Sequence, residues 1–169
     1  PGCTVRLAVR RYAYDVAAAS RFVDGVVRVT DASAFERDLR VLRPDAVIFA
    51  FPSRALARAA ARAGVPLRVG TARRWWHWVW CNLRPFVRRR GASLHEAQLN
   101  LQLLAPFVAD TVLPRDALWR LAGLADDASA GRQASSAPAA PPASPAAPDW
   151  PLRAGVTNVM LQVRSNGNG

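Results

Sequence analysis

Residues 47–69 read VIFAFPSRALARAAARAGVPLRV, and this stretch predicts the fold. Its first five residues are apolar and end at Pro52, as in a buried strand. Ser53 is then a suitable helix N-cap, and Gly64 can end the helix in a left-handed conformation. Pro66 prevents the helix from continuing, and a second apolar run follows. The stretch therefore predicts one β-α-β unit.

Similar apolar runs recur through the first 70 residues and begin at residues 5, 26, 47 and 67. Between the later runs, residues 33–42 and 54–63 have the composition of helices. Strands that alternate with helices of about ten residues indicate βαβ units and a parallel sheet. We therefore expect an α/β fold with a Rossmann-like parallel sheet.

Three further features follow this region. Ser93-Leu94-His95-Glu96 fits a capping box, in which Glu96 reaches back to the cap amide, and it predicts a helix that ends near Pro106. Residues 125–149 are mainly Ala, Pro and Ser, a composition typical of a mobile or extended linker. Residues 156–163 predict a strand that runs into a glycine-rich turn. The expected parts are a domain at 1–124, a linker at 125–149, and the first strand and loop of a truncated second domain at 150–169.

The composition limits the classes of function. The 169 residues carry a net charge of +11, and all 23 basic residues are arginine, which favours anionic partners. Two cysteines and two histidines without metal-like spacing predict no metal site. No apolar run approaches the roughly 18 residues that span a bilayer. We expect a soluble protein in a reducing, cytoplasmic setting.

A cluster of arginine, tryptophan and histidine follows the fourth apolar run. Such a cluster suits a surface that binds a partner both anionic and ring-shaped or apolar, because guanidinium groups pair with anions and indole rings stack on sugars. The alternative is that two or three of the tryptophans pack in the core while the arginines are solvated. The cluster comprises Arg73, Arg74, Trp75, Trp76, His77, Trp78 and Trp80.

A second basic group lies near Phe86 and Val87. Basic and aromatic residues together fit an anionic membrane surface, and a solvated loop is the alternative. The group comprises Arg84, Arg88, Arg89 and Arg90.

Three strings carry a resemblance to a known family: RAGVPLRVGT at residues 62–71, the arginine–tryptophan cluster, and LHEAQLNL at residues 94–101. Together they resemble the N-terminal half of bacterial lipopolysaccharide heptosyltransferases. The resemblance covers about residues 1–120 and resumes at residues 158–169. It implies the acceptor half of a two-domain GT-B glycosyltransferase. The chain is then a fragment, truncated at both ends and inactive alone, of an enzyme in the cytoplasm at the inner membrane.

The resemblance also implies partners and site residues. The donor is a nucleotide sugar such as an ADP-heptose, the acceptor is a lipid-linked oligosaccharide, and no cofactor, metal or nucleic acid is implied. Inverting transfer needs a base for the acceptor hydroxyl, whose identity stays unknown, and donors that stabilise the leaving diphosphate. The acceptor-binding residues implied are Arg73, Arg74, Trp76 and His77, and the donor-phosphate residues are Arg164, Ser165, Asn166 and Gly167.

Two other classes of function remain open on the residues alone. Stacking aromatic residues over a basic groove bind single-stranded nucleic acid, which suits the arginine excess. A non-catalytic α/β interaction domain, tethered through the proline-rich segment, is the other alternative.

Overall fold

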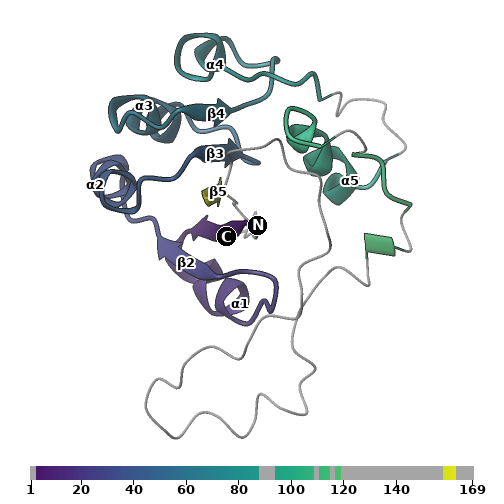
Figure 1. Ribbon diagram of the computed structural model, residues 1–169, viewed down its shortest axis with the longest axis horizontal. Helices are drawn as coiled ribbons and strands as arrows, with labels where there is room; N and C mark the ends of the chain where they lie inside the picture. Colours follow the sequence, from purple (N-terminus) through teal and green to yellow (C-terminus); the bar gives the residue numbers. More distant parts are fainter. Residues whose placement is uncertain (1–2, 88–93, 109–110, 115–116, 119–157, 163–169) are drawn as a thin grey trace, which may run out of the picture.

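All the strands described belong to one parallel sheet (Figure 1). The computed structural model describes residues 3–87, 94–108, 111–114, 117–118 and 158–162. The strands are β1 (Thr4–Val9), β2 (Gly25–Arg28), β3 (Ala46–Phe49), β4 (Leu67–Val69) and β5 (Asn158–Gln162). Their order in the sheet is β2-β1-β5-β3-β4. The predicted α/β fold with a parallel sheet is confirmed.

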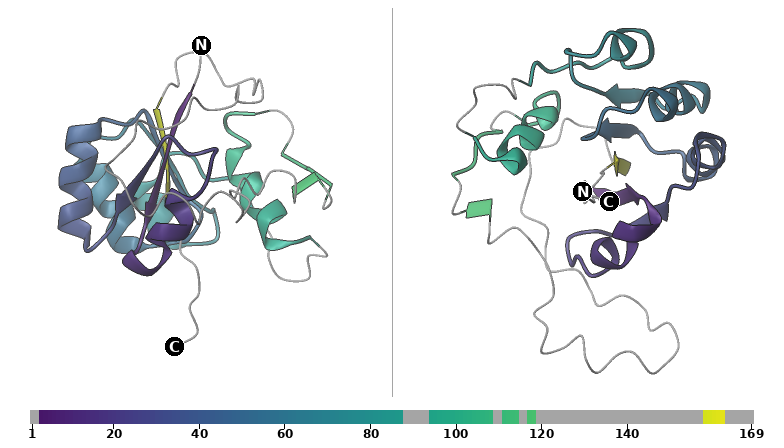
Figure 2. Two further views of the ribbon diagram at one scale, coloured as in Figure 1. Left: turned by 90° about the horizontal axis from the view of Figure 1, so that it is seen from below. Right: turned by 180° about the vertical axis from the view of Figure 1, so that it is seen from behind.

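The helices connect and flank these strands. They are α1 (Tyr14–Ala18), α2 (Ala32–Leu42), α3 (Arg54–Arg62), α4 (Trp75–Trp80) and α5 (Glu96–Leu101), with 3-10 turns at Arg11–Ala13 and Gln102–Leu104. Seen along its edge, the sheet has α2 and α3 on one side and α5 on the other (Figure 2). The β1-to-β2 connection leads toward one edge of the sheet, and the β3-to-β4 connection leads toward the other. The sheet is therefore doubly wound, as in Rossmann-like folds.

The β-α-β unit of residues 47–69 forms as its sequence predicts. Ser53 is the N-cap of α3, and its hydroxyl accepts a hydrogen bond from the backbone N–H of Leu56 at 3.4 Å. After α3, Gly64 has a φ of +77°, the left-handed conformation that glycine adopts without a Cβ clash. Both ends of the helix are thus fixed by local sequence.

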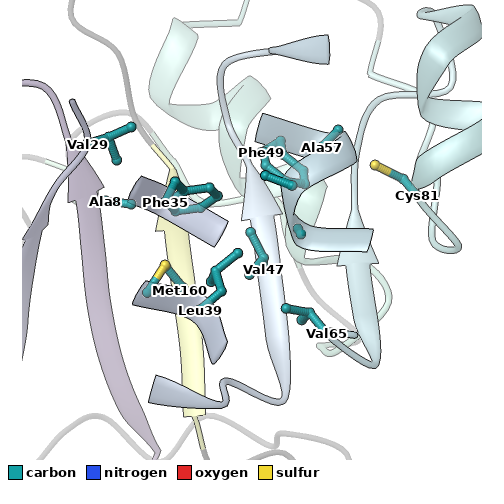
Figure 3. Close-up of a cluster of buried hydrophobic side chains, with 12 residues drawn as sticks. Ala8, Val29, Phe35, Leu39, Val47, Phe49, Ala57, Val65, Cys81 and Met160 are labelled. Atoms are coloured by element: carbon teal, nitrogen blue, oxygen red, sulfur yellow. The ribbon is translucent and has the colours of Figure 1, made fainter. Parts of the chain in front are cut away.

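Strand β3 divides the core into two layers, because all four of its residues are buried. Val47 and Phe49 pack in a cluster with Phe35 of α2 and Ala57 of α3 (Figure 3). The alternate residues Ala46 and Ile48 pack in a second cluster with Leu99 of α5 and with Leu103. A strand buried on both faces reads as a continuous apolar run, which is what the sequence has here.

Strand β5 occupies the position between β1 and β3. It pairs with both neighbours, so that Val159 lies opposite Val5 on one side and Ala46 on the other. Its Met160 belongs to the α2–α3 cluster, and Val159 belongs to the α5 cluster. The apolar run was recognised in the sequence, but we expected it to begin a second domain. The structure instead places it in this sheet, where its backbone satisfies the hydrogen-bonding groups of two strands that do not pair with each other. The predicted linker at residues 125–149 lies outside the described residues.

The start of α5 also differs from the prediction. His95, rather than Ser93, is the N-cap, and its Nδ1 accepts a hydrogen bond from the N–H of Ala97. The Gln98 side chain accepts from the N–H of His95 and so completes the capping box that we had assigned to Glu96. The motif is therefore present two residues later than predicted.

Replacing Met160 with alanine tests the position of β5. The side chain is 1% exposed among the residues that pack on α2, so the Met160→Ala variant should lose about 2–5 kcal/mol of unfolding free energy, measured by urea denaturation. Val41→Ala, at a side chain 81% exposed on α2, is the control and should change little. Equal stability of the two variants would show that residues 158–162 do not belong to this sheet.

Candidate functional site

The chain turns back on itself directly after the carboxyl end of β4. The N–H of Gly70 donates to the carbonyl of Leu83, and the N–H of Ala72 donates to the carbonyl of Pro85. These bonds hold the segment 83–87 beside the turn that leads into α4. Ligands of open α/β sheets bind outside the carboxyl ends of the strands, so this turn lies on the side of the sheet where a site is expected.

Helix α4 has two distinct faces. Its inward face carries Trp76, His77 and Trp80, of which His77 is fully buried and the two indoles are partly buried. Trp75, Trp78 and Val79 are 61%, 61% and 64% exposed. Because these three residues are spaced i, i+3 and i+4, they form one stripe along the outer face. Helix α4 is thus apolar on the side that faces solvent.

His77 anchors this helix to the end of the sheet. Its Nδ1 lies 3.1 Å from the carbonyl oxygen of Thr71, and its ring stacks on Phe49 at 6.2 Å between centroids. A carbonyl only accepts, so Nδ1 carries the proton, while Nε2 is buried without a partner among the described residues. Burial lowers the pKa of His77, and nearby Arg74 lowers this pKa further, whereas the Thr71 hydrogen bond opposes the shift. The side chain is therefore a neutral, buried anchor, and its predicted contact with an acceptor is wrong.

Gly70 permits the close approach of α4 to β4. A Cβ atom at this position would lie 2.5 Å from Nδ1 of His77 and 2.9 Å from Sγ of Cys81. Both distances are far below van der Waals contact, so only glycine fits without a shift of the helix. Cys81 is itself buried, and burial raises the pKa of its thiol to about 12. This thiol is therefore protonated at neutral pH and is not a nucleophile.

Arginine side chains cover the aromatic rings of this region, at distances within the range of cation–π attraction. Arg84 lies 4.7 Å from the ring centroid of Trp78, and Arg73 lies 5.9 Å from that of Phe86. The remaining pairs are Arg74 with Trp76 at 5.4 Å, and Arg54 with Trp75 at 5.2 Å and Trp80 at 5.4 Å. We call the exposed residues Arg54, Arg73, Arg74, Trp75, Trp78, Val79 and Phe86, with the half-buried Arg84, the Arg/Trp surface.

The structure brings together part of the predicted acceptor site. Arg73 and Arg74 are exposed side by side, and Trp76 is half-buried beneath Arg74, with its Nε1 lacking a partner among the described residues. Arg54 was not predicted at this surface, because it lies on α3 and reaches the rings only through the packing of α3 on α4. The predicted donor-phosphate residues Arg164, Ser165, Asn166 and Gly167 lie outside the described residues, as do Arg88, Arg89 and Arg90.

The segment of the sequence that supplies the Arg/Trp surface carries only positive charges. Residues 46–95 contain ten of the 23 arginines and no aspartate or glutamate. A signal for this surface was therefore present in the sequence as a long stretch without acidic residues. A surface of this kind attracts anions and repels cations.

A hollow lies near the opposite edge of the sheet, beyond the carboxyl ends of β1 and β2. It is lined by Arg11, Tyr12, Asp15 and Arg28.

The carboxylate of Asp31, which follows β2, accepts hydrogen bonds from the N–H groups of Ser33 and Ala34 as the N-cap of α2. These bonds hold the pKa of Asp31 below its usual value, so this group is a poor base.

Metal ligands do not cluster in the part of the chain that the structure describes, where no three His, Cys, Asp or Glu side chains are grouped to hold an ion. No helix within the described ranges is long and apolar enough to cross a membrane.

Comparisons with protein-family models, with curated proteins and with solved structures gave no match to this chain.

Replacing Gly70 with alanine should destabilise the protein, because the added methyl group collides with His77 and Cys81. We expect a loss of about 1–3 kcal/mol in thermal or urea unfolding. Gly25→Ala is the matched control on β2, where a Cβ would lie 3.6 Å from the nearest atom, an ordinary contact. Equal losses in the two variants would contradict the close packing of α4 on β4.

The buried histidine should make stability depend on pH. Below its usual pKa of 6.5 the unfolded chain binds a proton at residue 77 that the folded protein excludes, so the unfolding free energy should fall as the pH drops from 7 to 5.5. The His77→Gln variant should be less stable but should show a shallower slope over this interval. Urea denaturation at several pH values measures both slopes, and parallel slopes would show that His77 is not buried in its neutral form.

Proposed function

We propose that this chain is the acceptor-side domain of a glycosyltransferase. The enzyme would pass a sugar, a heptose by the family resemblance, from a nucleotide-diphosphate donor to a lipopolysaccharide core acceptor. The observation that carries the proposal is the exposed pair Arg73 and Arg74, which follows the carboxyl end of β4 beside aromatic rings. The doubly wound parallel sheet fits the N-terminal half of a GT-B enzyme.

The chemistry of such an acceptor matches the residues of the surface. Core oligosaccharides carry phosphate and carboxylate groups, and the planar guanidinium group can pair with either in a bidentate manner. The exposed face of Trp75 offers a platform for a sugar ring. Because Arg73 and Arg74 each lie over a ring, part of the cost of ordering their side chains is already met before the acceptor binds.

The proposal assigns binding to this domain and no catalytic step. Inverting transfer requires a base near the acceptor hydroxyl. Asp31 is engaged as a helix cap, and Cys81 is buried in its protonated form. The Arg/Trp surface itself includes no carboxylate, so the base is assigned to another part of the enzyme.

Binding of a phosphorylated lipopolysaccharide core in detergent micelles tests the proposal. Arg73→Ala and Arg74→Ala should each weaken binding about tenfold or more, because a hydrogen bond to a charged group contributes about 1.5–3 kcal/mol. Arg37→Ala is the charge-matched control, since it removes an exposed arginine from α2. The melting temperature should be unchanged in all three variants.

Two results would contradict the proposal. One is equal binding of a core from which both the phosphate and the carboxylate groups have been removed, since the arginines would then have no anion to recognise. The other is an equal loss in Arg37→Ala, which would indicate attraction by net charge alone.

A further inference from the structure

The outer face of α4 leaves large apolar side chains in water. Trp75, Trp78 and Val79 form its exposed stripe, and Phe86 is 66% exposed. A surface helix normally turns its apolar face toward the core and its polar face toward solvent. Contiguous exposed apolar residues rimmed by charges typically mark an interaction site.

Phe86 belongs to the same surface as α4. The Ala72–Pro85 hydrogen bond holds its segment beside the turn before α4, and Arg73 of that turn lies over its ring. Figure 1 shows α4 at one end of the molecule, outside α3 and β4. The exposed residues are therefore placed where a broad surface can meet them.

The polar atom of Trp78 is already satisfied within the protein. Its Nε1–H donates to the carbonyl of Ala72 at 2.9 Å. An indole whose N–H is paired can leave water without an orphaned donor, which removes the main cost of placing it in an apolar medium. Arg84, 4.7 Å from this ring, keeps a positive charge at the same position.

The charge of the region selects an anionic partner. Residues 46–95 carry ten arginines and no acidic residue, and Arg54, Arg73 and Arg84 each lie over one of the exposed rings. Indole rings prefer the interface of a bilayer, and arginines beside them pair with lipid phosphates. Val79 offers no ring for stacking on a nucleic-acid base, whereas a bilayer accepts any apolar side chain.

We propose that the Arg/Trp surface docks on an anionic lipid bilayer. Trp75, Trp78 and Phe86 enter the headgroup region, and the arginines over their rings pair with lipid phosphates. The docking is peripheral and requires no spanning helix. It shares Arg73 and Trp75 with the sugar-transfer proposal, but it needs only anionic lipid and no oligosaccharide.

Cosedimentation with vesicles tests the docking without any glycolipid. The chain should bind vesicles of phosphatidylcholine with one quarter phosphatidylglycerol and should bind pure phosphatidylcholine at least tenfold more weakly. Its binding should weaken as salt is raised. Quenching of tryptophan fluorescence by brominated lipid should occur in the mixed vesicles and should fall in Trp78→Ser.

Variants distinguish binding through the Arg/Trp surface from attraction by the net charge of the protein. Trp78→Ser and Phe86→Ser should each lower the partition coefficient about tenfold, and Arg54→Ala should lower it about fivefold. Phe22→Ser is the matched control, because Phe22 lies before β2 at the opposite edge of the sheet and carries Arg21 over its ring at 5.4 Å. All these side chains are exposed, so the folded state should persist, as far-ultraviolet circular dichroism can verify.

Three outcomes would overturn the docking proposal. They are equal binding to both kinds of vesicle, an equal loss in Phe22→Ser, and single-stranded RNA binding that depends on Trp78 while vesicle binding does not. The last outcome would make the surface a nucleic-acid site. The acceptor proposal is tested separately in detergent micelles. Either proposal can therefore fail while the other holds.

Discussion

The structure depends on the burial of β3 on both of its faces. Its four consecutive buried residues require a layer of side chains on each side of the sheet. The α2–α3 cluster supplies one layer, and the residues around Leu99 and Leu103 supply the other. Because both layers pack on the faces of a strand inside the sheet, the carboxyl ends of the strands are left for loops. The position of the Arg/Trp surface follows from that arrangement.

The contacts of His77 with the end of the sheet set the position of the Arg/Trp surface. His77 reaches over Gly70 to the carbonyl of Thr71, and its ring stacks on Phe49 of β3. These contacts fix the rotation of α4 about its own axis. Once His77 points inward, Trp75, Trp78 and Val79 must point outward, because they lie on the opposite side of a helix with 3.6 residues per turn. The exposure of the tryptophans is thus a consequence of packing elsewhere.

The same region joins two kinds of attraction that would be weak separately. An exposed arginine attracts an anion only weakly in water, and a single exposed aromatic ring is a common feature of protein surfaces. Here each exposed ring has a guanidinium group on its face, and residues 46–95 supply no carboxylate to neutralise it. Anionic, partly apolar partners such as glycolipids and bilayers meet both requirements at once. This shared chemistry connects the two proposals while leaving each to its own experiment.

Local sequence determined the parts of the structure whose causes are local. The strand at residues 47–51, the Ser53 cap and the left-handed Gly64 were predictable, because apolar runs, caps and glycine act within a few residues. Only the tertiary structure placed β5 between β1 and β3, because a strand pairs with whichever edges complete the sheet, however distant they are along the chain. It also decided which members of the arginine–tryptophan cluster are buried. His77 and Trp78 are adjacent aromatic residues in the sequence, and only the approach of α4 to Gly70 buries the first as an anchor and leaves the second exposed.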